Sequence, residues 1–170
     1  MEERPHRGDL ELEEDLDFER RSWIIERIGW AVMVMVAFAA LAGLFGPGPL
    51  SDTSAGERGG RLWLEYSRFG RLRAPMTLRV YLGPNASQQE MARVWLSRDY
   101  LEGIHIQGIN PPPERVEAGP EQFTYVFPVS ETSRPTAVTF SVKPGRFGRQ
   151  RGCMGLANGP TLCFGQFIYP

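Results

Sequence analysis

Residues that carry enzymatic chemistry are scarce in this sequence. Its 170 residues include only two histidines and two cysteines. His6 lies in the N-terminal tail, and His105 alternates with isoleucines in a predicted strand, so neither has a second metal ligand nearby. The G-x-S-x-G, P-loop and H-E-x-x-H motifs are also absent. We therefore expect no catalytic residues, no metal and no cofactor, and we predict that the protein is not an enzyme.

Lysine is nearly absent, because Lys143 is the only lysine among 19 basic residues. We interpret the arginine excess as a compositional bias of the genome, so it does not indicate a nucleic-acid partner. Charge is also unevenly distributed. Residues 1–19 carry nine acidic residues and two arginines, a net charge of −7, whereas residues 47–170 carry 14 basic and ten acidic residues, a net charge of +4. The isoelectric point of the whole chain is therefore uninformative.

One long stretch, residues 28–46, has no charge at all. As an α-helix it spans about 28 Å, close to the hydrocarbon thickness of a bilayer. The stretch is apolar on every side, and the Gly-Pro-Gly-Pro sequence of residues 46–49 ends the helix. Trp23 and Trp30 lie near its N-terminal end, where indole rings favour the membrane interface. The sequence predicts a transmembrane helix over residues 23–46.

This stretch has two other interpretations. A helix buried in the core of so small a domain needs a solvated polar face, which the stretch lacks. A signal peptide has a small-residue cleavage site, and Ala40 and Ala42 supply one. Its N-terminal region, however, would be 27 residues long and acidic at its start, which is unusual for a signal peptide. An uncleaved anchor is the better interpretation.

The flanks of the predicted span indicate its orientation. The next basic residue after it is Arg58, whereas three arginines lie just before the uncharged stretch of residues 28–46: Arg20, Arg21 and Arg27. The positive-inside rule therefore places the N-terminus in the cytoplasm and residues 47–170 outside the cytoplasmic (inner) membrane of a bacterium. Residues 1–22 are acidic and poor in bulky apolar groups, which predicts a disordered cytoplasmic tail. That tail is either simply solvated or a docking segment for a basic partner.

The rest of the chain changes to short alternating runs of apolar and polar residues. They follow a predicted linker over residues 47–60 and are separated by Gly, Pro and Asn. Seven or more such strands predict an all-β fold, an immunoglobulin-like antiparallel β-sandwich over residues 61–170. Only residues 86–103 have a pattern that also fits a helix. The predicted strands are the runs beginning at Leu62 and Met76, and residues 92–97, 104–109, 115–119, 122–129, 136–144, 151–157 and 161–169.

The two cysteines flank a predicted hairpin. If the chain turns around Asn158, Cys153 and Cys163 stand nearly opposite each other on adjacent strands. An oxidising exterior permits a disulfide between them, and we favour this interpretation. Two buried free thiols and a redox-active pair are the alternatives, although a redox pair usually has the closer C-x-x-C spacing.

Two segments, SRFGRLR and GRFGRQRG, combine several arginines with a Phe-Gly pair. Basic and aromatic residues interleaved in this way bind nucleic acid in some proteins, but not outside a membrane. The segments are either ordinary turns with solvated arginines or a basic rim that contacts lipid phosphates or an acidic partner. The residues concerned are Arg68, Arg71 and Arg73 in the first segment and Arg146, Arg149 and Arg151 in the second, and the second set is our candidate for lipid or partner contacts.

The layout resembles a class of bacterial membrane proteins with a short charged cytoplasmic tail, one span and an external β-sandwich. The similarity lies in residues 44–51, in YLEGIHIQGINPPPERVEAG and in the terminal strand CFGQFIYP. The resemblance implies a single-pass anchor, and a larger multi-pass membrane protein as the partner. It brings no catalytic residues to this chain.

Two functions fit these observations. The first is an accessory or interaction protein, anchored in the lipid bilayer, that presents its β-sandwich to a membrane-protein partner. The second is an extracytoplasmic binding module for a small ligand or a cell-envelope component. That function needs a concave aromatic site, for which the candidates are Trp63, Trp95, Tyr100 and Tyr125. An open aromatic pocket would favour the second function, and a closed sandwich the first.

Overall fold

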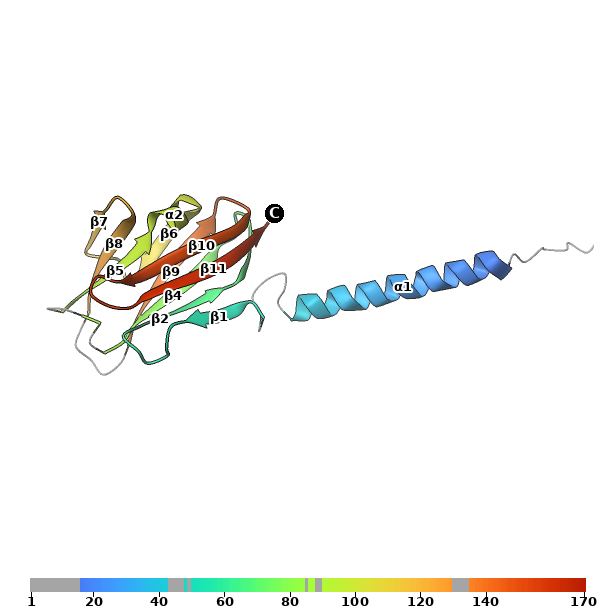
Figure 1. Ribbon diagram of the computed structural model, residues 1–170, viewed down its shortest axis with the longest axis horizontal. Coiled ribbons are helices and arrows are strands. Elements are labelled where there is room, and N and C mark those ends of the chain that lie inside the picture. The colour runs from blue at the N-terminus through green and yellow to red at the C-terminus, as the bar shows by residue number, and fades with distance from the viewer. Residues whose placement is uncertain (1–15, 43–47, 49, 85, 88–89, 130–134) are drawn as a thin grey trace, which may run out of the picture. The chain divides into compact units, whose positions relative to one another are not determined.

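The computed structural model describes residues 16–42, 48, 50–84, 86–87, 90–129 and 135–170. The chain divides into two compact units, Met1–Phe38 and Ala39–Pro170. Most of the predicted acidic tail lies outside the described residues. Among the described residues, most of one helix lies in the first unit and the strands lie in the second (Figure 1).

Helix α1 (Leu16–Leu41) is long and strongly apolar. Its segment Arg21–Leu41 is long and apolar enough to cross a membrane. The large apolar side chains of this segment are all exposed, from 46% at Ile24 to 79% at Leu41. The helix thus begins before the predicted span, and residues 43–46 of that span lie outside the described residues.

The second unit is a β-sandwich of two sheets (Figure 1). One sheet has five strands in the order β1-β2-β4-β9-β6, and the other has six in the order β3-β11-β10-β5-β8-β7. A short helix, α2 (Arg98–Glu102), follows β5. The strands are β1 (Asp52–Ala55), β2 (Leu62–Ser67), β3 (Phe69–Arg71), β4 (Met76–Leu82), β5 (Met91–Ser97), β6 (Ile104–Asn110), β7 (Arg115–Ala118), β8 (Gln122–Pro128), β9 (Thr136–Pro144), β10 (Gly148–Leu156) and β11 (Thr161–Tyr169).

The alternating sequence pattern produces the core. Along β4, Met76, Leu78, Val80 and Leu82 are buried, because every second side chain of a strand points to the same face. The inner faces of both sheets contribute to one continuous apolar cluster. At its centre the Phe140 ring of one sheet makes edge-to-face contacts with two rings of the other sheet, those of Tyr125 at 5.4 Å and Phe127 at 6.3 Å between centroids. The sandwich is therefore closed by side chains that interdigitate between the sheets.

The prediction of a β-sandwich is confirmed, but the prediction that all its strands are antiparallel is wrong for one pair. Strand β3 runs parallel to β11, with Phe69 opposite Phe167. The reason is that the chain changes sheets at Arg68, between the end of β2 and the start of β3, without reversing its direction. Part of the predicted linker also forms an edge strand, β1, which pairs with β2.

A buried polar group connects α2 to the six-stranded sheet. The Tyr100 hydroxyl donates a hydrogen bond of 2.7 Å to Gln166 Oε1, and Gln166 Nε2 donates one of 2.9 Å to the backbone oxygen of Ser67. Burial raises the pKa of the Tyr100 phenol, which keeps it a proton donor. Gly152 lies directly beneath the Tyr100 ring, where a Cβ atom would come within 2.7 Å of ring carbon Cγ. Glycine is therefore required for this ring to pack against β10.

Candidate interaction surface

The two arginine-rich segments of the sequence meet on the outer face of the six-stranded sheet. Strand β3 lies beside β11, and β11 lies beside β10. In register across the three strands, Phe69 faces Phe167, and Phe167 faces Arg149. Two residues further along β10, Arg151 faces Gly165. Residues separated by about 80 positions in the sequence thus form one surface.

A hollow of about 470 Å³ lies at this junction. Gly165 has no side chain, and a Cβ atom there would meet only the Gln150 backbone oxygen, at 3.9 Å. The missing side chain leaves space beside Arg151. We call this feature the arginine–aromatic hollow, and it is lined by Arg68, Phe69, Arg149, Arg151, Gly165, Gln166 and Phe167.

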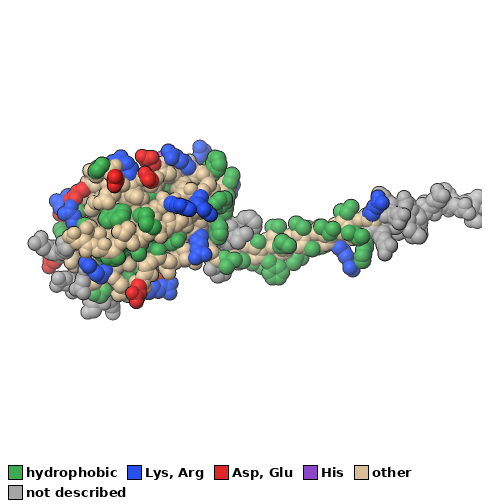
Figure 2. Space-filling view, in the orientation of Figure 1, with side chains coloured by type: hydrophobic (Ala, Val, Ile, Leu, Met, Phe, Trp, Pro, Cys, Tyr) green, Lys and Arg blue, Asp and Glu red, His purple; other side chains and the backbone are tan. Residues whose placement is uncertain are grey.

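The arginines of the hollow have no acidic partner among the described residues. The ion pairs that the described chain forms lie elsewhere, between Arg58 and Glu65 and around Glu117. Strands β3, β10 and β11 contain no acidic residue. The Arg68 guanidinium donates a hydrogen bond of 3.1 Å to the uncharged Thr53 Oγ1. On the face shown in Figure 2, basic and apolar side chains adjoin near the end of the sandwich where β11 finishes.

The three predicted contact residues therefore lie in two places, two of them in the hollow and one in a turn outside it. Arg149 and Arg151 point outward from β10 into the hollow, and both are exposed. Arg146 is exposed in the turn between β9 and β10 and does not line the hollow. Sequence reasoning named Arg68 as part of a motif but did not place it beside Arg149. The parallel pairing of β3 with β11 brings them together, and no local pattern indicates that pairing.

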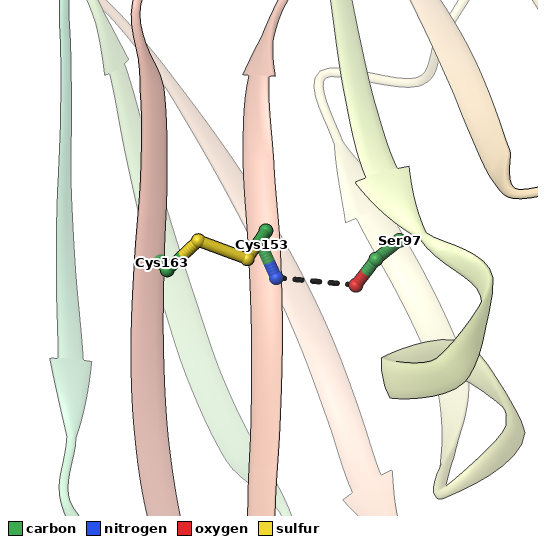
Figure 3. The surroundings of a disulfide bond; sticks show 3 residues. All are labelled: Ser97, Cys153 and Cys163. Atoms are coloured by element: carbon green, nitrogen blue, oxygen red, sulfur yellow. Dashed lines mark hydrogen bonds between the residues drawn. A yellow bond between two sulfur atoms is a disulfide. The ribbon is translucent and has the colours of Figure 1, made fainter.

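The predicted disulfide is present, between Cys153 of β10 and Cys163 of β11 (Figure 3). The two residues are direct cross-strand partners, with a Cα–Cα distance of 4.1 Å. The Cys153 backbone N–H points away from β11 and donates a hydrogen bond of 3.1 Å to Ser97 Oγ at the end of β5. Such a short closed loop contributes about 2–3 kcal/mol to stability. The bridge fixes β10 and β11 next to the Arg151–Gly165 pair.

The four aromatic residues that a ligand site would have needed do not come together. Trp63 stacks on Tyr81 on the five-stranded sheet, with ring centroids 4.8 Å apart. Trp95 covers Gly155 of the six-stranded sheet. Tyr100 and Tyr125 are buried in the core.

A second, polar hollow of about 590 Å³ lies over β1, β2 and β4. Two of its charged groups pair with each other, since Arg58 lies 3.6 Å from Glu65. Tyr81 donates a hydrogen bond of 2.9 Å to the same carboxylate. This hydrogen bond to Glu65 raises the pKa of the Tyr81 phenol. The Glu65 carboxylate is thus already engaged by two partners from the chain itself.

The described residues contain no group of three or more His, Cys, Asp or Glu side chains that is arranged to hold a metal ion. His105 is exposed on β6, which forms one edge of the five-stranded sheet. It faces Lys143 of β9 across the strand pair.

No family model matches the sequence, and no curated protein matches it. Among solved structures, the sandwich is similar to a cohesin module from a family 33 glycoside hydrolase of Clostridium perfringens ATCC13124. The sequence identity is 9%, and the match covers 71% of this chain and 98% of that chain with a TM-score of 0.40.

Proposed function

We propose that this protein is a non-enzymatic accessory protein anchored by a single span in the cytoplasmic membrane of a bacterium. Its immunoglobulin-like sandwich lies outside that membrane and is presented to a membrane-protein partner. The observation that carries the proposal is the exposure of every large apolar side chain along Trp23–Leu41 of α1. Contact of such an apolar surface with lipid chains is favourable, whereas its contact with water is unfavourable.

The orientation rests on the charges beside α1. Arg21 and Arg27 lie in its N-terminal part, and the Arg27 guanidinium sits 3.8 Å from the centre of the Trp23 ring. Indole rings favour either membrane interface, and the arginines favour the cytoplasmic side. The disulfide between Cys153 and Cys163 fits the opposite, oxidising side for the sandwich.

Presentation, rather than capture of a small ligand, fits the sandwich. Its interior is filled by interlocking rings, and its candidate ligand-site aromatics are dispersed over two faces and the core. Strand β6 ends the five-stranded sheet and carries no acidic residue, lysine or arginine. Strand β7, an edge strand of the six-stranded sheet, carries the Arg115–Glu117 ion pair, and such edge charges discourage pairing with another strand. The β6 edge is therefore the more open of the two to a partner strand.

Co-purification tests this function. The full chain is extracted from native membranes in mild detergent after gentle crosslinking, and captured proteins are identified by mass spectrometry. The control chain ends at Leu50, so that it keeps the helix and lacks the sandwich. We expect a membrane protein to co-purify in stoichiometric amount with the full chain and not with the control chain. A monomeric full chain, or equal capture by both chains, contradicts the proposal.

A further inference from the structure

We propose that the arginine–aromatic hollow binds the phosphate headgroups of anionic phospholipids in the membrane that holds α1. The sandwich would then be docked on the bilayer surface through Arg68, Arg149 and Arg151. This inference rests on the membrane anchoring in the proposed function and adds the chemistry of a second contact with the bilayer.

The hollow lies where the chain enters the sandwich. Ser51, just before β1, accepts a backbone hydrogen bond of 2.7 Å from Arg68, and the Arg68 oxygen accepts one of 2.7 Å from Phe167. Two backbone hydrogen bonds therefore connect the start of the sandwich to the hollow. Residues 42–50 join α1 to Ser51, and nine extended residues reach at most about 32 Å. On the proposed anchoring, this linker keeps the hollow within reach of the bilayer surface.

The charge of the hollow suits a phosphate. Arg149 and Arg151 are exposed and have no acidic partner among the described residues, so binding an anion requires no existing ion pair to break. A guanidinium group binds phosphate oxygens with two parallel N–H donors. Three arginines around one depression supply several such donors. A basic residue next to an anionic lipid surface strengthens binding about fivefold.

Exposed aromatic residues in the hollow and in the turn before β10 suit the interfacial region of a bilayer. Phe167 is 48% exposed within the hollow, and Phe147, two residues before Arg149 in that turn, is 73% exposed. Large exposed aromatic rings are unfavourable in water but are accommodated among lipid headgroups. Arginine and phenylalanine side by side thus match a surface that is anionic outside and apolar beneath.

The test uses the full chain in lipid nanodiscs, either of phosphatidylcholine alone or of phosphatidylcholine with phosphatidylglycerol. Hydrogen–deuterium exchange is followed in peptides that cover β3 and the turn at residues 145–147. We expect slower exchange in both segments in the anionic discs. Replacing Arg68, Arg149 and Arg151 with Gln should remove this protection, because each arginine lost weakens binding to the anionic surface about fivefold.

A matched control removes the same charge elsewhere, through Arg58→Gln, Arg79→Gln and Arg115→Gln, and should keep the protection. Gly165→Val fills the hollow without straining the backbone, since its position has space for a side chain, and should weaken protection while leaving every arginine in place. It also tests the hollow itself rather than net charge.

The possible results distinguish the failure of lipid binding from the failure of the membrane anchoring on which it rests. Equal exchange in neutral and anionic discs, with the chain still integrated, overturns lipid binding and leaves the anchoring intact. Protection that appears only in native membranes would indicate a protein on this surface and also overturns it. A chain that does not remain in either kind of disc overturns the anchoring, and the lipid contact with it.

Discussion

Replacing Gly152 with alanine is expected to lower the free energy of unfolding of the sandwich by about 2–3 kcal/mol. The added Cβ would lie 2.7–2.9 Å from three atoms of Tyr100, which is closer than such contacts occur. Tyr100 has little room to move, because it is 1% exposed and its hydroxyl is bonded to Gln166. Its ring also packs edge-to-face on Phe164, 4.9 Å away. The strain therefore falls on the packing between α2 and the sheet.

Guanidinium denaturation of the full chain in detergent, followed by near-ultraviolet circular dichroism, measures this effect. Gly165→Ala on the neighbouring strand is the matched control, because its Cβ would meet nothing closer than 3.9 Å. That control should change the stability by less than about 0.5 kcal/mol. If the two variants unfold at the same denaturant concentration, the packing of Tyr100 on Gly152 is not as described.

Introducing two charges into α1 is expected to abolish membrane integration. Val34→Arg together with Phe38→Arg places both charges on one side of the helix, one turn apart, within its apolar segment. Each arginine near the middle of a span costs about 3 kcal/mol, so the pair costs about 6 kcal/mol. Both native side chains are exposed, so the change removes no buried packing.

Alkaline carbonate extraction of membranes separates integrated from peripheral protein and measures this loss. We expect the double variant in the soluble fraction, and the apolar control, Val34→Leu with Phe38→Leu, in the pellet with the native chain. A double variant that stays in the pellet would mean that α1 does not hold the protein in the bilayer.

Alternation along the sequence was enough to predict most of the strands. In β4, and in β9 from Val138 onward, every second residue is apolar and buried, so the pattern and the burial coincide. The turn at Asn158 likewise allowed the pairing of Cys153 with Cys163 to be predicted, because a hairpin brings neighbouring segments together. Local patterns suffice where the contacts are local.

The candidate surface was less accessible to sequence reasoning. Strand β3 has only three residues, too few for an alternating pattern, and β1 lies in a Gly/Ser-rich segment that reads as a linker. The hollow exists because β3 pairs with β11, about 100 residues later in the chain. Such a long-range pairing depends on the whole packed sandwich rather than on the residues of either strand. The arginines were therefore identified individually, but not as one site.

The location of the sandwich is the most direct test of the account. A reporter fused after Pro170 measures it: alkaline phosphatase, which needs disulfides and so works only outside the cytoplasm, and, in parallel, a fluorescent protein that matures only inside. We predict phosphatase activity and no fluorescence in intact cells. Fluorescence without phosphatase activity would place the sandwich in the cytoplasm and contradict both the orientation and its presentation to an external partner.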